Sequence, residues 1–336
     1  MLGSVATLHS ARPPSNFHPW SSPMAHDLTA PEWQEPDSIL RAGLSWSLAL
    51  NAERKSPRTV EGYLDNLELF DRWLRATQRS TTLAEIAADD VRAWMIGLTN
   101  RVGEPARPST VQTRYKGLRV FFAWAVGEEL LDASPMVNIK PPTLDVPEIP
   151  VLSDDELAAI LKACDGKSFD ERRDSAIVRL FLDTGMRLAE LVNLTLDDLD
   201  LFGNGVAHVI GKGSRGRACP FGAKTAKAID AYLRVRASHQ FADSPRLWIG
   251  SQGPLTGDGV RALLGRRGTQ AGVPGLHAHQ FRHTAAHDWL ANGGQEGELM
   301  KIMGWRARQM VDRYGSSAAS ERAHDSHKRL ARGDRV

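Results

Sequence analysis

Six residues in the second half of the chain share the ability to donate a hydrogen bond to an anion. In chain order they are Arg187, Lys212, His279, Arg282, Trp305 and Tyr314. Arginine can bind a phosphate group through two parallel N–H donors, which lysine cannot do. A tyrosine hydroxyl can attack phosphorus and form a covalent phosphotyrosine, and a lysine can protonate the hydroxyl that leaves. The set therefore predicts covalent phosphoryl transfer on a phosphodiester, with Tyr314 as nucleophile and Lys212 as proton donor.

The same set lacks the paired carboxylates that a Mg²⁺ site would use. Two arginines and further donors can instead neutralise the charge of a pentavalent phosphoryl transition state, so the prediction is a reaction without metal or cofactor. A zinc site is the alternative, because His283 and His287 lie four positions apart and His279 is close. No glutamate lies between that pair and no cysteine or acidic third ligand is evident. A zinc-dependent hydrolase is thus the rival from an unrelated class.

Two of the segments that contain these residues have a simple structural alternative. Arg187 and Glu190 lie three positions apart and share one face of a predicted helix, where a weak surface ion pair would also fit.

The string Gly-Lys-Gly-Ser-Arg-Gly around Lys212 matches a dinucleotide-binding fingerprint by letter, but a strand ending at Pro220 follows where that fingerprint needs a helix. A β-hairpin with Lys212 near its tip fits better, and an ordinary exposed lysine remains the alternative.

The last two residues of the set constrain the local path of the chain. Trp305 and Tyr314 are nine positions apart, which on one unbroken helix is a rotation of about 900° and places them on opposite faces. If both serve one site, the chain must bend between them. Tyr314 has polar and basic neighbours, whereas Tyr63, Tyr115 and Tyr232 lie in amphipathic patterns typical of a core.

The elements that would position these residues indicate a mostly α-helical protein with a small β-ribbon, in the α+β class. The first part predicts four helices. In the first, Leu40, Leu44, Leu48 and Ala52 recur at helical spacing; the second starts near Ser56, the third runs through Val91 and Leu98, and the fourth starts near Ser109. In the second part, Ser153 and Glu156 form a capping box. Helices at about 153–164 and 170–185, a ribbon at about 199–221 and further helices follow. The predicted division is a flexible tail at 1–37, a helical domain at 38–135, a proline-rich linker at 136–150 and a catalytic domain at 151–336.

The charge distribution and the cysteine content indicate which kind of binding partner and which cell compartment fit the chain. The 336 residues contain 42 Lys and Arg against 40 Asp and Glu, but the charge is uneven. Residues 151–200 have a net charge of −6, whereas residues 201–285, with 12 basic and 3 acidic side chains, have +9. A localised basic stretch of this kind is typical of an anion-binding face, and DNA is the reasonable anion. The two cysteines, Cys164 and Cys219, are expected to be core residues in a reducing compartment, and no membrane segment is evident.

Taken in order, these motifs closely resemble the tyrosine recombinases, also called the phage integrase family. The resemblance covers nearly the whole chain from about residue 38. Thr184-Gly185-Met186-Arg187 with Glu190-Leu191 is similar to the family's first arginine box, and His279-Gln280-Phe281-Arg282 to its second. Met303-Gly304-Trp305 and Tyr314 match the third position and the nucleophile at the family's nine-residue offset. Many members have histidine where this chain has Trp305, whose N–H can still donate to a phosphate oxygen.

The resemblance implies a role for each residue. Arg187 and Arg282 would bind the scissile phosphate, and His279 would help to activate Tyr314 or bind the same phosphate. Tyr314 would form a 3′-phosphotyrosyl link, while Glu190 would support the site without reacting. The N-terminal helices would be a core-binding domain. The partners implied are duplex DNA with inverted-repeat sites and three further copies of the chain, a homo-tetramer that joins two sites, in the cytoplasm and associated with the nucleoid.

Two nearer alternatives share parts of this interpretation. A type IB topoisomerase would use the same chemistry to relax supercoils without a partner site. A DNA-binding protein that has lost catalysis would keep the motifs only in part, and here they are complete.

Overall fold

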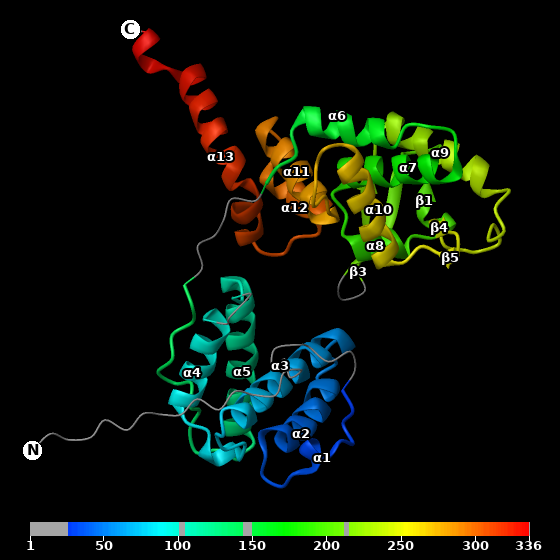
Figure 1. Ribbon diagram of the computed structural model, residues 1–336. Coiled ribbons are helices and arrows are strands. Elements are labelled where there is room, and N and C mark those ends of the chain that lie inside the picture. Colours follow the sequence, from blue (N-terminus) through cyan, green and yellow to red (C-terminus); the bar gives the residue numbers. More distant parts are fainter. Residues whose placement is uncertain (1–25, 101–104, 144–149, 212–214, 336) are drawn as a thin grey trace, which may run out of the picture. The chain divides into compact units, whose positions relative to one another are not determined.

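The computed structural model describes residues 26–100, 105–143, 150–211 and 215–335 (Figure 1). The chain divides into two compact units, the first ending at Val146 and the second beginning at Pro147. Each unit has its own hydrophobic core, and each is described here by itself. Among the described residues no helix is long and apolar enough to cross a membrane.

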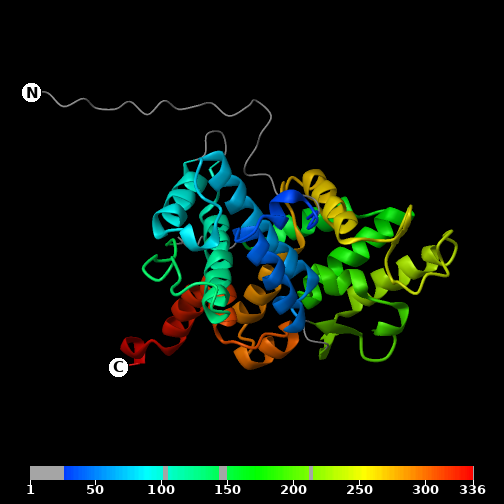
Figure 2. The same cartoon turned by 90° about the horizontal axis from the view of Figure 1, so that it is seen from below.

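The first unit is a bundle of helices, seen in blue to green in Figures 1 and 2. Its elements are α1 (Pro31–Gln34), α2 (Ile39–Ala52), α3 (Pro57–Ala76), the 3₁₀ turn η1 (Leu83–Glu85), α4 (Ala88–Thr99) and α5 (Pro108–Gly127). The side chains of Ser38 and Ser56 accept backbone N–H groups at the starts of α2 and α3, which satisfies donors that a helix start otherwise leaves unpaired. The four long helices predicted for this region are therefore confirmed.

Aromatic rings fill the centre of this bundle. The rings of Trp46 and Phe121 meet edge to face at 5.2 Å, and those of Phe70 and Trp94 lie 4.9 Å apart. All four side chains are at most 2 % exposed. Side chains of this size dominate the burial energy of a small domain, so these contacts hold α2 to α5 and α3 to α4.

The stripe predicted for the first long helix is wrong in its second half. Leu40 is fully buried, but Leu48 is 71 % exposed. A spacing of four residues advances about 40° per step around a helix, so a stripe that repeats only at this spacing leaves the core after two turns. Trp46 and Leu50 occupy the inward face of α2 instead.

The first unit also extends beyond both predicted limits. Residues 31–37 were expected to belong to a tail, yet Trp33 of α1 is 1 % exposed within the bundle core. Met136, expected in the linker, is 4 % exposed, and the hydroxyl of Tyr115 donates to the carbonyl of Ile139 at 2.7 Å. Single large apolar residues next to prolines thus fold back onto the bundle, a contact that no local periodicity indicates.

The second unit packs helices around a three-stranded antiparallel ribbon. Its helices are α6 (Asp154–Ala163), α7 (Phe169–Thr184), α8 (Leu188–Asn193), α9 (Ala223–Arg236), α10 (Gly257–Gln270), α11 (Ala278–Ala291), α12 (Glu296–Met303) and α13 (Gln309–Leu330), with 3₁₀ turns η2 (Leu196–Asp198) and η3 (Arg332–Arg335). Its strands are β1 (Leu199–Asp200), β2 (Val206–Gly211), β3 (Arg215–Pro220), β4 (Ile249–Gly250) and β5 (Gly253–Pro254).

The predicted ribbon and helices are confirmed, and so is the capping box of Ser153 and Glu156 at the start of α6. The ribbon has the order β1-β2-β3, with Val209 opposite Arg217. The short pair β4–β5 was not predicted, because two residues per strand are too few for a pattern.

Helix α7 is the centre of the second unit. It packs against α9 and α11, and Figure 1 shows α7 and α9 side by side. Ile177, Leu180 and Phe181 are fully buried, and the ring of Phe181 stacks on Phe281 of α11 at 5.8 Å. The end of α7 is therefore fixed with respect to the start of α11, which matters for the site below. The two cysteines, Cys164 and Cys219, lie buried in the same core, as predicted.

A buried ion cluster also ties α7 to α10. Asp174 is fully buried and accepts Nη2 of Arg173 and Nε of Arg267, each at 2.8 Å. Both arginines are less than 9 % exposed. The cluster balances charges that would be very costly in a core if one partner were missing.

We predict that Asp174→Asn lowers the free energy of unfolding by about 3–5 kcal/mol, because it leaves the buried Arg267 without its carboxylate partner and Arg173 with only the exposed Asp170. Asp170→Asn is the matched control, since Asp170 pairs with the same Arg173 but is 63 % exposed. Its expected cost is below about 1 kcal/mol. Urea unfolding followed by tryptophan fluorescence measures both, and equal costs would contradict the assigned importance of the buried carboxylate.

Candidate active site

Arg282, in the second turn of α11, has its guanidinium buried where three segments meet. The side chain is 2 % exposed. Nη1 donates to the carbonyl of Gly185 and Nη2 to the carbonyl of Met303, both at 2.7 Å. The guanidinium also lies over the ring of Trp305, 5.4 Å from its centroid, a favourable cation–π geometry. These contacts fix the position and the orientation of the charge.

The two accepting carbonyls lie at helix ends made by glycines. Gly185 (φ 54°) ends α7 and Gly304 (φ 64°) ends α12, both in the left-handed region. The positive φ of Gly185 favours glycine there, and a Cβ at this position would lie 2.7 Å from Cε of Met303, which would have to move. The glycine at 185 thus turns the chain as predicted and brings the ends of α7 and α12 together.

Arg187 and Glu190 form a cap and not the predicted pair on one helix face. Arg187 precedes α8 as its N-cap residue, and its backbone N–H donates to Oε2 of Glu190 at 2.7 Å. Its Nη1 donates to Oε1 of Glu190 at 2.9 Å. Arg187 does not share a helix face with Glu190 because α8 begins only at Leu188, after the turn at Gly185. The ion pair of the alternative interpretation is present, but it is not a surface pair on both sides, because Glu190 is 6 % exposed.

Arg217 of β3 completes this cluster. Its Nη1 and Nη2 donate to the two carboxylate oxygens of Glu190, each at 2.7 Å, and its Nε donates to the carbonyl of Ile302 at 2.9 Å. Burial raises the pKa of Glu190, but hydrogen bonds from Arg217 and Arg187 and the charge of Arg217 outweigh this and hold the pKa at about 2, below its ordinary value of 4.5. Glu190 therefore stays ionised at every physiological pH.

The remaining predicted residues are described to different extents. The hairpin of β2 and β3 is confirmed, but Lys212, between the strands, lies outside the described residues. His279 is exposed in the first turn of α11, and its ring meets the ring of the buried His283 edge to face at 4.6 Å. Among the described residues, no group of three His, Cys, Asp or Glu side chains is placed to hold a metal ion.

The chain bends between Trp305 and Tyr314, as predicted. Helix α12 ends at Met303, Trp305 is 6 % exposed in a small apolar cluster, and α13 starts at Gln309. Tyr314 falls within α13, and its side chain lies outside what the structure describes. Val311, one turn earlier, is buried in the same apolar cluster, and α13 packs against α11. The helix of Tyr314 is therefore docked on the helix of His279 and Arg282.

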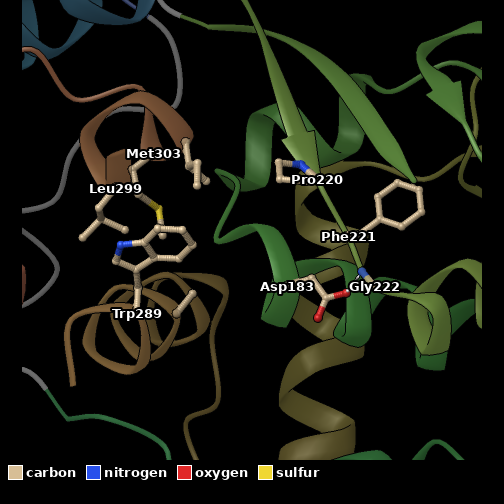
Figure 3. Close-up of a pocket in the computed structure, with 9 residues that line it drawn as sticks. Asp183, Pro220, Phe221, Gly222, Trp289, Leu299 and Met303 are labelled. Carbon is tan, nitrogen blue, oxygen red and sulfur yellow. Dashed lines mark hydrogen bonds between the residues drawn. The ribbon is translucent and has the colours of Figure 1, made fainter. Parts of the chain in front are cut away.

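An apolar pocket of about 240 Å³ lies behind this cluster (Figure 3). Trp289, Leu299 and Met303 form one side, and Pro220 and Phe221 lie on the other. The backbone carbonyl of Met303 accepts Arg282, while its side chain lines the pocket. The lining is otherwise mostly apolar, and its one carboxylate, Asp183, accepts the backbone N–H of Gly222 at 2.7 Å.

Comparison with known proteins decides the family. A model described as the phage integrase family matches residues 150–321, and one described as the phage integrase N-terminal SAM-like domain matches residues 44–132. The first match alone covers more than half of the 336 residues. The chain is a member of the phage integrase family. It is thus a tyrosine recombinase, a DNA strand-transferring enzyme that cuts and rejoins DNA at specific sites, and the resemblance seen in the sequence is confirmed.

Relatives of this integrase-family chain match it over most of its length. The tyrosine recombinase XerC of Bacillus licheniformis is 30% identical over 260 residues, which is 74% of this chain and 82% of the relative. XerC of Corynebacterium glutamicum is 29% identical over 283 residues, 82% of this chain and 84% of the relative.

Solved structures of other proteins have a fold similar to that of this integrase-family chain. The Tn1549 transposon integrase in complex with transposon right end DNA has a TM-score of 0.68 at 17% identity, over 88% of this chain and 99% of that one. The XerH recombinase bound to a palindromic difH substrate has a TM-score of 0.65 at 17% identity, over 86% and 87%. The predicted fold class, a helical N-terminal domain followed by a recombinase catalytic domain, is confirmed.

Sequence reasoning missed the contact of Arg217 in this integrase fold. A signal was present, because alternation along the strand places Arg217 on the same face as Cys219, which is fully buried, and opposite Val209, which is 3 % exposed. An arginine on the inward face of a strand needs a buried acidic or carbonyl partner. The strand pattern predicts that such a partner exists, but it does not identify Glu190.

We predict that Glu190 stabilises the folded protein above about pH 4.5 and that this contribution is lost as the pH falls towards about 2, because its folded pKa lies below its ordinary value. The difference in free energy of unfolding between the wild type and Glu190→Gln should shrink by about 3 kcal/mol over that interval. Urea unfolding at several pH values measures it, with the exposed Glu298→Gln as control. A difference that does not change with pH would contradict the paired state of Glu190.

Proposed function

We propose that the protein breaks and rejoins duplex DNA through a 3′-phosphotyrosyl intermediate, with Arg187 and Arg282 binding the scissile phosphate. One observation carries the proposal: the carbonyl that holds Nη1 of Arg282 belongs to Gly185, two residues before Arg187. Two arginines therefore converge at one end of α7. Such a pair supplies planar, multidentate recognition of a phosphate group.

The reaction balances without an external energy source. The hydroxyl oxygen of Tyr314 attacks phosphorus and loses its proton, with His279 assisting, while the bond from phosphorus to the 5′ oxygen breaks. Lys212 donates a proton to that oxygen, so a neutral 5′-hydroxyl leaves. The arginines and the N–H of Trp305 stabilise the charge on the non-bridging oxygens. The phosphotyrosyl ester keeps the bond energy, and a 5′-hydroxyl of a partner strand reverses the step.

Duplex DNA is the substrate that the charge distribution favours. Residues 201–285, which include Lys212, His279 and Arg282, have a net charge of +9. Contacts from such a stretch to DNA phosphates release counterions, so affinity should fall steeply with salt. We assign the first unit, which includes α1 and the residues up to Ile139 that pack on the bundle, to binding DNA around the cut site, and the second unit to catalysis. We place the protein in the cytoplasm on the nucleoid.

A homo-tetramer that joins two inverted-repeat sites is the assembly that we propose. Related solved structures include XerH bound to a palindromic substrate and a lambda integrase tetramer bound to a Holliday junction. A palindromic site suits two copies of one chain, and strand exchange needs a second site. The outcome would be integration, excision or resolution of DNA.

We predict that the protein forms a covalent adduct with nicked duplexes containing its own flanking repeats, in the presence of EDTA, and that Tyr314→Phe abolishes it. The substitution keeps the aromatic ring but removes the attacking oxygen. Denaturing gels with labelled DNA measure the adduct, and exchange between two labelled sites separates recombination from simple relaxation. An adduct that persists in Tyr314→Phe refutes the nucleophile, and a need for added Mg²⁺ refutes the metal-free mechanism.

A second prediction concerns the proton donor. Lys212→Ala should slow cleavage by about 10²–10⁴-fold, the usual contribution of a general acid. A substrate with sulfur in place of the 5′ bridging oxygen should restore the rate, because a thiolate leaves without a proton. Arg187→Ala is the control, since loss of a phosphate contact should not be rescued by sulfur. Equal rescue of both variants, or of neither, would contradict the role of Lys212.

A further inference from the structure

The carboxylate of Glu190 accepts two hydrogen bonds from the side chain of Arg217 but one from the side chain of Arg187. Oε1 of Glu190 accepts Nη1 of Arg187 at 2.9 Å and Nη1 of Arg217 at 2.7 Å. Oε2 accepts the backbone N–H of Arg187 and Nη2 of Arg217, both at 2.7 Å. Arg217 thus binds the carboxylate with both Nη atoms, whereas the side chain of Arg187 makes one hydrogen bond to it.

The arginine that makes fewer hydrogen bonds to the carboxylate is also the more exposed one. The side chains of Glu190 and Arg217 are 4 % and 11 % exposed, and that of Arg187 is 43 % exposed. The inner pair is electrically neutral, so the cluster keeps one net positive charge on its exposed member. Among the described residues, no other acceptor lies within hydrogen-bond distance of Nε or Nη2 of Arg187.

We propose that Arg217 is a positioning residue that occupies the carboxylate of Glu190 and so keeps one edge of the Arg187 guanidinium available to the scissile phosphate. The proposal rests on the proposed function, because it is there that Arg187 is assigned to the phosphate. Glu190 is needed to hold Arg187 in place, but alone it would compete with the phosphate for the same donors. Arg217 removes that competition.

The competition follows from the chemistry of the pair. A carboxylate and a guanidinium prefer two parallel hydrogen bonds, and a buried carboxylate without enough donors is strongly unfavourable. If Arg217 were absent, Glu190 would draw a second donor from Arg187, the nearest remaining cation. The phosphate would then lose both a pair of N–H groups and the net positive charge.

A hydrogen bond and the strand pairing keep Arg217 from moving in the same way. Its Nε donates to the carbonyl of Ile302 at 2.9 Å, and its backbone is paired opposite Val209 in the ribbon. The hydrogen bond also links β3 to the end of α12, so the test must separate a role in charge competition from a role as a structural link.

The test is a double-mutant cycle with Arg217→Gln, Glu190→Gln and the double variant, measured as the single-turnover rate of adduct formation on nicked duplex. Arg217→Gln should slow the reaction about 10–100-fold, the usual effect of losing a hydrogen bond to a charged group. The double variant should be at least about tenfold faster than Arg217→Gln, because no carboxylate remains to capture Arg187. Arg172→Gln is the matched control, since it removes an arginine–carbonyl bond to Ala231 (3.2 Å) away from Glu190.

A double variant that is as slow as Arg217→Gln, or slower, would overturn the proposal. If Arg217 acted only as a structural link between β3 and α12, removal of the Glu190 carboxylate could not restore the rate. A crystal structure of Arg217→Gln gives a second answer that does not depend on cleavage. We expect two donors of the Arg187 side chain on Glu190 in that crystal, and a single one would also overturn the proposal. If the wild type forms no adduct, the proposed function fails, while the crystal still decides the competition.

Discussion

The buried charge of Arg282 is the constraint on which the rest of the site depends. A guanidinium that is 2 % exposed is unfavourable unless fixed acceptors replace water. The acceptors here are the carbonyls of Gly185 and Met303, which lie at the C-terminal ends of α7 and α12. Helix ends leave such carbonyls without partners inside the helix, and the helix dipole makes them negative. Two dipoles therefore stabilise one cation without neutralising it.

Several features of the catalytic unit follow from this contact. The two helices must end at the same point, which requires left-handed glycines at 185 and 304 and contact between Gly185 and the Met303 side chain. The residues just beyond these ends then lie beside the buried charge, and they are Arg187 and Trp305. The positions of the exposed Arg187 and of the buried Trp305 are thus a consequence of how the guanidinium of Arg282 is satisfied.

Sequence reasoning could propose candidates for the reactive residues because the chemistry restricts their types, and it could place most helices because their starts have local signals such as the serine caps. It failed where a contact joins distant segments. Trp33 and Met136 pack on the bundle without any periodic pattern, and Leu48 leaves the core because a four-residue spacing drifts around the helix. The partner of Arg217 could not be identified either, because Glu190 lies 27 positions away on another element.

A site that neutralises phosphate charge with arginines must solve a problem that a metal ion does not have. Each guanidinium needs acceptors to fix its long side chain, yet an ionised acceptor cancels the charge that the site requires. Arg282 avoids the conflict by using carbonyl dipoles, which orient it but leave its charge intact. Arg187 is held by the carboxylate of Glu190, which would cancel its charge, and Arg217 supplies the compensating charge from the ribbon. Once a carboxylate holds Arg187, a second cation is therefore needed to leave the cluster with a net positive charge.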